Sequence, residues 1–211
     1  MSTFGSRPDR VALESAGDDM MALIERLWPV YRTLAGPGVR ETLEILGEPV
    51  GGLTLSHAPT GTRVLDWIVP DEWHLQRAFI ETPHGRRICD TARNNLHVVG
   101  YSTAVDARMT LDELQLHLYS LPDQPDAIPY VTSYYERKWG FCIAQRERDG
   151  LEDGIYRVHI DASHVPGAVD YGQLVLPGRS QREVLFSTYC CHPAMANNEL
   201  SGPVLAVALA Q

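Results

Sequence analysis

The first fifty residues place hydrophobic side chains at helical spacing. Between Asp18 and Leu34 the apolar residues fall three to four positions apart, which predicts a helix with one buried face. Pro29 lies within this pattern and predicts a kink or an early end. A second, shorter helix is expected from Val39 to Gly47, after the breaker Gly36-Pro37-Gly38.

From about residue 60 the pattern changes to short alternating runs that are typical of β-strands. The expected strands lie at 64–69, 75–81, 86–90 and 96–102, of which the second and third form a hairpin. Thr110 is placed to cap a short helix, and a Pro- and Tyr-rich connection follows over residues 121–135. Residues 60–135 are therefore predicted to form a compact, mostly-β module.

Three more strands are expected at 154–160, 169–176 and 183–188. The last is rich in apolar residues and leads into an apolar helix, as at the start of a βαβ unit. The predicted fold class is α/β. N-terminal helices occupy 1–59, the mostly-β module 60–135, and the start of an α/β core 136–211, which is cut within a helix.

Composition and charge narrow the possible partners. The 211 residues include 27 acidic and 18 basic side chains, giving a net charge of −9. This charge argues against binding to nucleic acid or to an anionic membrane surface. No apolar run approaches the roughly 18 residues that span a bilayer, and the first ten residues lack the apolar core of a signal peptide. We therefore expect a cytoplasmic protein.

The candidate chemistry lies between the last predicted strand and the final helix. Ligands of open α/β sheets bind beyond the carboxyl ends of strands, and His192 lies in such a place, stiffened by Pro193. Neutral imidazole is a common zinc ligand, although a lone histidine is often only a satisfied polar residue. Asn198 and Glu199 follow at a helix start, where helix capping alone would explain them.

The cysteines offer a third possibility at the same loop. Cys89 and Cys142 are expected to be small buried hydrophobic residues. Cys190 and Cys191 stand beside His192, which suggests a thiol nucleophile. However, adjacent side chains on an extended segment point to opposite faces, so sequence neighbours seldom form a nucleophile–base pair.

Several long strings of residues carry a resemblance to a known family. The run Ser187-Thr-Tyr-Cys-Cys-His-Pro-Ala-Met-Ala-Asn-Asn-Glu-Leu-Ser-Gly-Pro203 resembles bacterial aminopeptidase-like proteins that are often associated with polysaccharide biosynthesis and are related to the co-catalytic zinc aminopeptidases. Similar strings lie at 66–73, 94–99, 121–135 and 139–142, so the resemblance covers the chain from about residue 20.

The resemblance implies a partial zinc-aminopeptidase-like sheet of the phosphorylase/hydrolase type, with a small β-rich inserted domain. It also implies that this chain matches the N-terminal half of proteins about twice its length, whose second half holds further metal ligands and the general base. Zinc-dependent hydrolysis of peptide or amide bonds is the implied activity, and we expect the present portion alone to be inactive.

Residue by residue, the resemblance places His192 at the first zinc-binding histidine. It places Asn198 where the zinc aminopeptidases have an aspartate that bridges two zinc ions. An amide is neutral and binds zinc weakly, so this departure predicts one metal or none rather than two. His192 and Asn198 are the predicted metal ligands, and Glu199 ranks behind Asn198.

Two alternative functions remain open from the sequence. The first is a non-catalytic protein that binds a peptide or glycan on a peptidase fold, using the aromatic residues Trp67, Trp73, Tyr134, Tyr135 and Trp139, whose plainer role is core packing. The second is a cysteine-dependent amidase. Because the predicted sheet is incomplete, we also expect self-association or a second chain that completes the fold.

Overall fold

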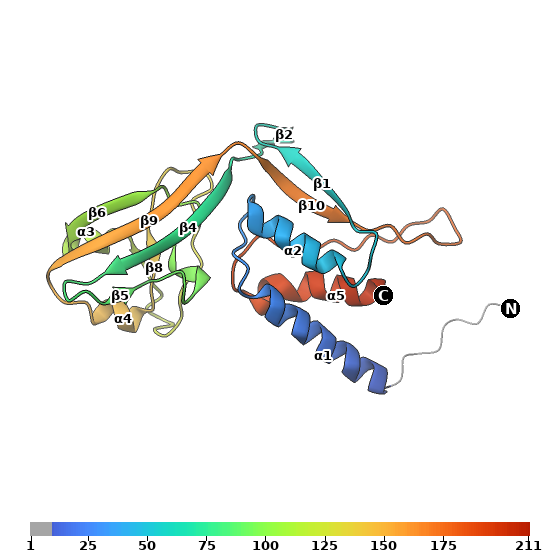
Figure 1. The fold of residues 1–211 in the computed structure, drawn as a ribbon, viewed down its shortest axis with the longest axis horizontal. Coiled ribbons are helices and arrows are strands. Elements are labelled where there is room, and N and C mark those ends of the chain that lie inside the picture. Colours follow the sequence, from blue (N-terminus) through green and yellow to red (C-terminus); the bar gives the residue numbers. More distant parts are fainter. Residues whose placement is uncertain (1–9) are drawn as a thin grey trace.

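The structure is a computed structural model that describes residues 10–211, so the segment on which the signal-peptide expectation rests lies outside the described residues. Two lobes stand side by side and are joined at one end by paired strands (Figure 1). We call them the helical lobe and the β lobe. Helices and sheets are both present, which confirms the α/β class in its coarse form, a mixture of both element types.

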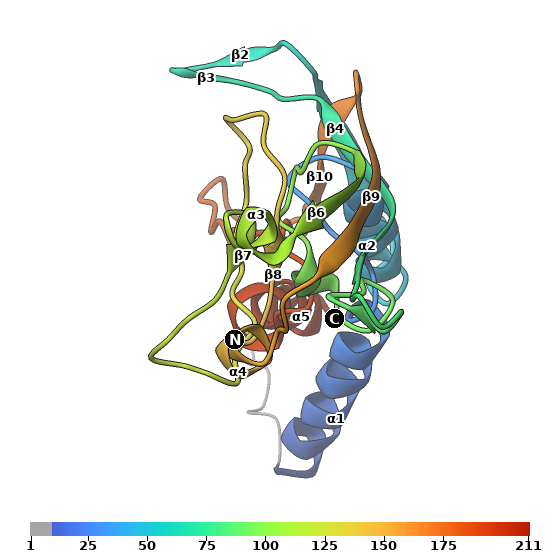
Figure 2. The same cartoon turned by 90° about the vertical axis from the view of Figure 1, so that its left-hand side faces the viewer.

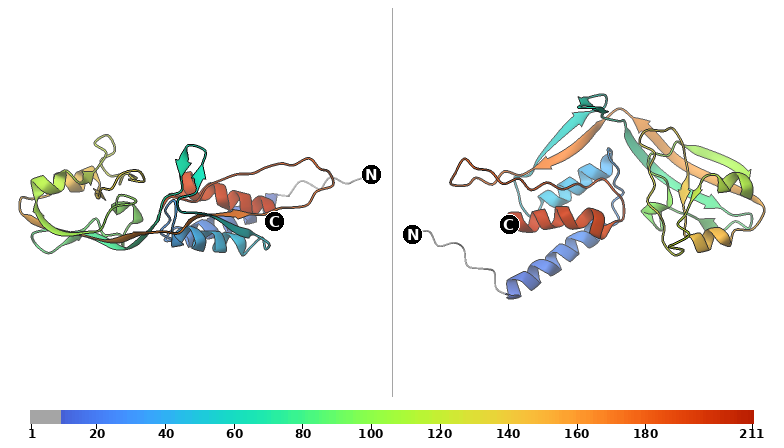
Figure 3. Two further views of the ribbon diagram at one scale, coloured as in Figure 1. Left: turned by 90° about the horizontal axis from the view of Figure 1, so that it is seen from above. Right: turned by 180° about the vertical axis from the view of Figure 1, so that it is seen from behind.

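Among residues 10–211, the helical lobe contains three α-helices and a two-stranded ribbon. Helix α5 (Ser201–Ala210) lies between α1 (Arg10–Leu27) and α2 (Pro37–Gly47), as the view from behind also shows (Figure 3). The helices share a hydrophobic core of buried side chains: Leu27, Val30, Ile45, Leu46, Leu200 and Val204. Strand β1 (Thr54–Pro59) pairs antiparallel with β10 (Ala168–Gln173).

The β lobe is built on a four-stranded antiparallel sheet in the order β5-β4-β9-β6. These strands are β4 (Glu72–Glu81), β5 (Arg87–Ile88), β6 (Val105–Thr110) and β9 (Ile155–Val165). Smaller elements pack around it: η1 (Asn95–His97), α3 (Leu111–Gln115), β7 (Leu118–Tyr119), β8 (Phe141–Cys142) and α4 (Gln145–Asp149). The hairpin of β2 (Arg63–Val64) and β3 (Trp67–Ile68) projects away from the sheet (Figure 2).

A β-bulge keeps the long strand β4 amphipathic. Trp73 is an odd-numbered position and Ile80 an even one, yet both are buried in the same core. The pairing with β9 shifts register between Leu75 and Arg77, and this extra residue returns the apolar side chains to one face. Tyr156, Val158 and Ile160 of β9 complete that face.

The lobes meet along the segment between α1 and α2. Trp73 donates its backbone N–H to the Ala35 carbonyl at 3.1 Å, and Tyr31 packs against the Trp73 ring at 5.8 Å. Arg40 of α2 binds both carboxylate oxygens of Glu72, at 2.7 and 3.0 Å, and also reaches Asp170. Hydrogen bonds and one ion-pair network therefore tie the helical lobe to the first residues of β4.

Several predicted elements are confirmed. Helix α1 ends at Leu27, before Pro29, and α2 ends at Gly47. Thr110 forms a capping box with Glu113 at the start of α3, where each residue bonds the other's backbone N–H. The 75–81 strand and its return through residues 87–88 are also present.

Other expectations are wrong, and each has a physical reason. Residues 64–69 form the tight hairpin β2–β3 rather than one strand, because Leu65 adopts a φ of 56° and reverses the chain. The expected strand at 96–102 begins instead with η1, which Asn94 caps. Strand β9 belongs to the same sheet as β4, so the sheet extends beyond residue 135, the expected end of the mostly-β module.

The largest difference concerns residues 183–188, which form no strand. A strand needs a neighbour for its backbone hydrogen bonds, and no described segment pairs with these residues. Val184, Leu185 and Phe186 are instead 82 %, 88 % and 69 % exposed. The expected parallel sheet therefore does not form within residues 10–211, where the multi-residue ladders are antiparallel except for the short β7–β8 pair.

Candidate metal centre

The loop that precedes α5 folds back on itself. Residues 189–195 lead into a short π-helical turn, η2 (Ala196–Leu200), which continues into α5. Ala194 adopts a φ of 44°, and the N–H groups of Glu199 and Leu200 both bond the Met195 carbonyl. Gly202 then lies against Thr188, since a Cβ at Gly202 would stand 2.2 Å from its hydroxyl oxygen. This close approach fixes the turn beside the preceding loop.

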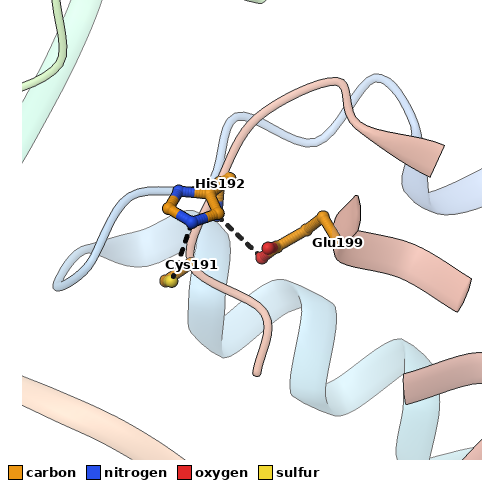
Figure 4. Close-up of side chains that lie close together, drawn as sticks. All are labelled: Cys191, His192 and Glu199. Atoms are coloured by element: carbon orange, nitrogen blue, oxygen red, sulfur yellow. Dashed lines mark hydrogen bonds between the residues drawn. The ribbon is translucent and has the colours of Figure 1, made fainter. Parts of the chain in front are cut away.

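The turn brings three potential metal ligands together. Ligand atoms of Cys191, His192 and Glu199 all lie within 4.8 Å of one another (Figure 4). The Glu199 carboxylate accepts the backbone N–H of His192 at 2.7 Å. The Cys191 sulfur lies 3.8 Å from Nε2 of His192. A thiol, an imidazole and a carboxylate therefore lie close enough together to share one ion.

Arg32 supports this loop from the segment between α1 and α2. It is fully buried, and its Nε donates to the His192 carbonyl at 2.9 Å, while one Nη donates to the Leu27 carbonyl at 2.6 Å. The other Nη of Arg32 and the Oε2 of Glu199 are buried without a hydrogen-bond partner. Buried polar atoms of this kind call for an explanation, and a bound ion is one of the usual ones.

Burial governs the protonation of the group. Desolvation raises the pKa of Glu199 to about 6 and that of Cys191 to about 12, and in Cys191 the Glu199 charge adds to the effect. Desolvation, assisted by the positive charge of Arg32, lowers the pKa of His192. At neutral pH the imidazole is therefore neutral and the thiol is protonated.

The predicted site residues meet different surroundings. His192 lies at the centre of the group. Asn198 is exposed, and its backbone carbonyl accepts the Tyr189 hydroxyl at 3.1 Å. The role of Asn198 as a ligand stays a prediction. The sequence placed Glu199 behind Asn198 and named neither Cys191 as a possible ligand nor Arg32 as a contact of this loop. A lone arginine in an otherwise apolar stretch is the available signal for Arg32.

The donor set fits a divalent metal. Zinc binds cysteine, histidine and carboxylate ligands, and its catalytic sites usually have three protein ligands. A cation between these groups would offset the desolvation that raises the pKa of Glu199 and of Cys191. It would also give the partnerless Glu199 oxygen a ligand bond.

The thiol-nucleophile alternative fits less well. The pKa values of Cys190 and Cys191 are raised to about 11 and about 12, mainly by burial, so neither supplies a thiolate at neutral pH without a metal. The expected burial of Cys89 and Cys142 is confirmed.

The aromatic residues proposed for binding do not form one surface. Trp73 is 1 % exposed in the core, and Trp139 stacks on His117 at 3.6 Å. Tyr134 and Tyr135 line a cavity of about 110 Å³. The other residues around it are Pro70, Asp71, Tyr101, Ser133, Glu136, Arg137 and His164.

Comparison with known proteins gives the family context. Residues 72–163 match a domain of unknown function, DUF2172. The chain is 41 % identical over 195 residues to a protein of Clostridium acetobutylicum with the provisional name of a polysaccharide biosynthesis protein with aminopeptidase-like domain. The predicted resemblance to the aminopeptidase-like proteins is confirmed. The match covers 92 % of this chain and 45 % of the relative, so the chain spans about half of that protein.

A solved structure shows the same likeness. A crystal structure of a protein from Clostridium acetobutylicum, provisionally described as a peptidase, matches with a TM-score of 0.89 at 41 % identity. The match covers 93 % of this chain and 46 % of that one. The metal-capable group at 191–199 lies outside the DUF2172 match, in the part that follows it. Within residues 10–211, no helix has both the length and the apolarity to cross a bilayer.

Proposed function

We propose that this chain carries part of the site of a zinc-dependent, aminopeptidase-like hydrolase of peptide or amide bonds. The observation that carries the proposal is the convergence of Cys191, His192 and Glu199 within 4.8 Å. Its support is the likeness to a protein whose name includes an aminopeptidase-like domain. His192 and Glu199 come from the stretch in which the sequence placed the metal ligands.

The residues of this chain divide the work among them. Cys191, His192 and Glu199 would hold the metal, which when bound supplies Lewis acidity toward the scissile carbonyl and an activated water. Arg32 fixes the backbone of the loop through the His192 carbonyl. Its positive charge also favours the ionised forms of Glu199 and Cys191.

The general base and any further ligands are proposed to come from the remainder of the longer relatives. The sheet that relates this chain to the zinc aminopeptidases would be completed in the same way. On this account the 211-residue chain binds metal but does not turn over substrate. Asn198, which is exposed in the same turn, stays a predicted further ligand.

A binding protein without catalysis is the alternative. The cavity beside Tyr134 and Tyr135 favours it, because Tyr135 is 81 % exposed and Arg137 and Asp71 offer both charges nearby. Such a pocket suits a small polar ligand with one flat apolar face. This alternative requires no metal at residues 191–199.

Metal content separates the two functions. We expect about one zinc per chain by mass spectrometry after incubation with zinc and gel filtration, and a loss of that zinc in His192→Ala and Glu199→Gln. Asn197→Ala is the matched control, since it alters the same turn at an exposed position that is not a predicted ligand, and it should retain zinc. Zinc-free wild-type protein after this treatment would overturn the hydrolase proposal.

A further inference from the structure

The imidazole of His192 has a second partner, from the β lobe. Its Nδ1 lies 2.8 Å from the hydroxyl of Tyr130, and the two rings meet edge to face with centroids 4.6 Å apart. Tyr130 belongs to the connection at 121–135, inside the DUF2172 match, whereas His192 belongs to the loop before α5. A domain of unknown function therefore touches the candidate metal centre.

Tyr130 is held firmly in this position. The chain just after it is bonded to Gly100, whose N–H donates to the Val131 carbonyl at 2.9 Å and whose carbonyl accepts the Ser133 N–H at 2.8 Å. The Tyr130 hydroxyl lies 2.8 Å from that of Tyr134. Tyr134 in turn packs edge-on against Tyr101, with the centroids 4.9 Å apart.

These contacts leave two arrangements of the hydrogens. If the imidazole carries its hydrogen on Nδ1, it donates to Tyr130, Tyr130 donates to Tyr134, and Nε2 keeps a lone pair. If the hydrogen is on Nε2, Tyr130 donates to Nδ1, and Nε2 cannot bind a metal. The two states differ in the direction of the whole chain of hydrogen bonds.

The neighbour of Nε2 favours the first arrangement. The Cys191 sulfur faces Nε2 at 3.8 Å, and a thiol has a hydrogen to donate. A lone pair on Nε2 accepts that hydrogen. An N–H on Nε2 would instead donate to the sulfur, which is a weak acceptor, and would leave the thiol hydrogen unused. The Tyr130 hydroxyl, with one hydrogen and two neighbours, then accepts from Nδ1 and donates to Tyr134.

We propose that Tyr130, supplied by the DUF2172 region, is a positioning residue that holds the His192 hydrogen on Nδ1 and so directs the Nε2 lone pair toward Cys191 and Glu199. Metal-binding histidines commonly have their second ring nitrogen fixed by such a partner. The role of this arrangement in metal binding rests on the proposed zinc function. The position of the hydrogen on Nδ1 does not depend on a bound metal.

The test is the tautomer of His192 in the metal-free, ¹⁵N-labelled chain at slightly alkaline pH. Long-range ¹H–¹⁵N correlation spectra distinguish a protonated Nδ1 from a protonated Nε2, and the His192→Gln spectrum assigns the signals. We expect Nδ1–H in the wild type and a shift toward Nε2–H in Tyr130→Phe, which keeps the ring but removes the acceptor. Tyr189→Phe is the matched control and should leave the tautomer unchanged, because the Tyr189 hydroxyl bonds Asn198 instead.

A second variant protects the test against misfolding. Tyr134→Phe removes the acceptor of the Tyr130 hydrogen, which frees that hydrogen for Nδ1 and should move the tautomer in the same direction. Nε2–H in the wild type, or no shift in either folded variant, overturns the proposal. Zinc affinity gives the separate readout. It should fall about 10–100-fold in Tyr130→Phe, whereas a wild type without zinc binding would refute the hydrolase proposal and leave the tautomer result standing.

Discussion

The β lobe and the segment after β10 differ in the exposure of their apolar side chains. In the β lobe Trp73, Phe141 and Tyr156 are each no more than 1 % exposed. Between β10 and α5, Val175, Leu185 and Phe186 are 85 %, 88 % and 69 % exposed. The first region buries its apolar side chains in a core of its own. The second leaves apolar side chains exposed and pairs with no sheet.

This difference bears on the candidate metal centre. The loop with His192 follows the uncovered segment, yet its neighbours on the other side are firmly packed: Arg32 is fully buried and Tyr130 belongs to the β lobe. The geometry of the site is therefore set by the packed regions, and it does not require another segment or chain to cover residues 183–188. The exposed apolar side chains are available for contacts with another chain or another part of a longer one.

The largest expected difference between the two regions is tested by replacing one phenylalanine in each. Phe141→Ala should lower the free energy of unfolding by about 3–5 kcal/mol, because it leaves a cavity in the closed core. Phe186→Ala, the matched substitution in the uncovered segment, should change it by less than about 0.5 kcal/mol. Denaturant unfolding of both variants measures the difference. Equal losses would show that residues 183–188 are packed.

The junction of the lobes should respond to acid through Glu72. Its hydrogen bonds to Arg40 are the largest effect on its pKa and outweigh burial, which raises it. Together these effects lower the pKa of Glu72 from 4.5 to about 2. Because the pKa is lower in the folded state, this stabilisation is present above pH 4.5 and is lost as the pH falls toward 2. Glu72→Gln should lower the free energy of unfolding by about 1–2 kcal/mol at neutral pH. This value is small because Arg40 is partly exposed and solvent screens the ion pair.

Unfolding curves across pH provide the measurement. The difference between wild type and Glu72→Gln should shrink toward acid pH. Glu152→Gln is the control, since Glu152 pairs with His84 while 76 % of its side chain is exposed. A pH-independent difference for Glu72→Gln would contradict the role given to its charge.

The smallest predicted effect concerns association. The uncovered segment predicts that this chain self-associates through residues 183–188. Leu185→Ser should weaken self-association by about tenfold, as expected from losing one buried leucine. Leu65→Ser is the control, because Leu65 is 87 % exposed at the tip of the β2–β3 hairpin. Sedimentation of a wild type that stays monomeric at high concentration would contradict the prediction.

Local signals in the sequence were sufficient where the deciding contacts are local. The Thr110 capping box and the end of α1 before Pro29 both depend on neighbours a few residues away. The hairpin reversal at Leu65 was missed because its positive φ falls on a residue that gives no turn signal. The pairing of β4 with β9 joins residues more than seventy positions apart, which periodicity does not reveal.

The site shows the same limit. The sequence placed chemistry at His192, but the η2 turn decides that Glu199 rather than Asn198 faces the loop. Arg32 and Tyr130 are 160 and 62 positions from His192, so their contacts depend on packing within the helical lobe and between the two lobes. The expected strand at 183–188 is wrong for a similar reason, since no described segment pairs with these residues.

The most direct test of the metal centre is the absorption spectrum of the chain with cobalt(II) in place of zinc. Binding at Cys191, His192 and Glu199 predicts a thiolate-to-cobalt charge-transfer band in the near ultraviolet, lost in Cys191→Ser and retained in Cys190→Ser. The neighbouring cysteine is the matched control, because it is not among the grouped ligands. A spectrum without this band, or one that depends on Cys190 instead, would contradict the account.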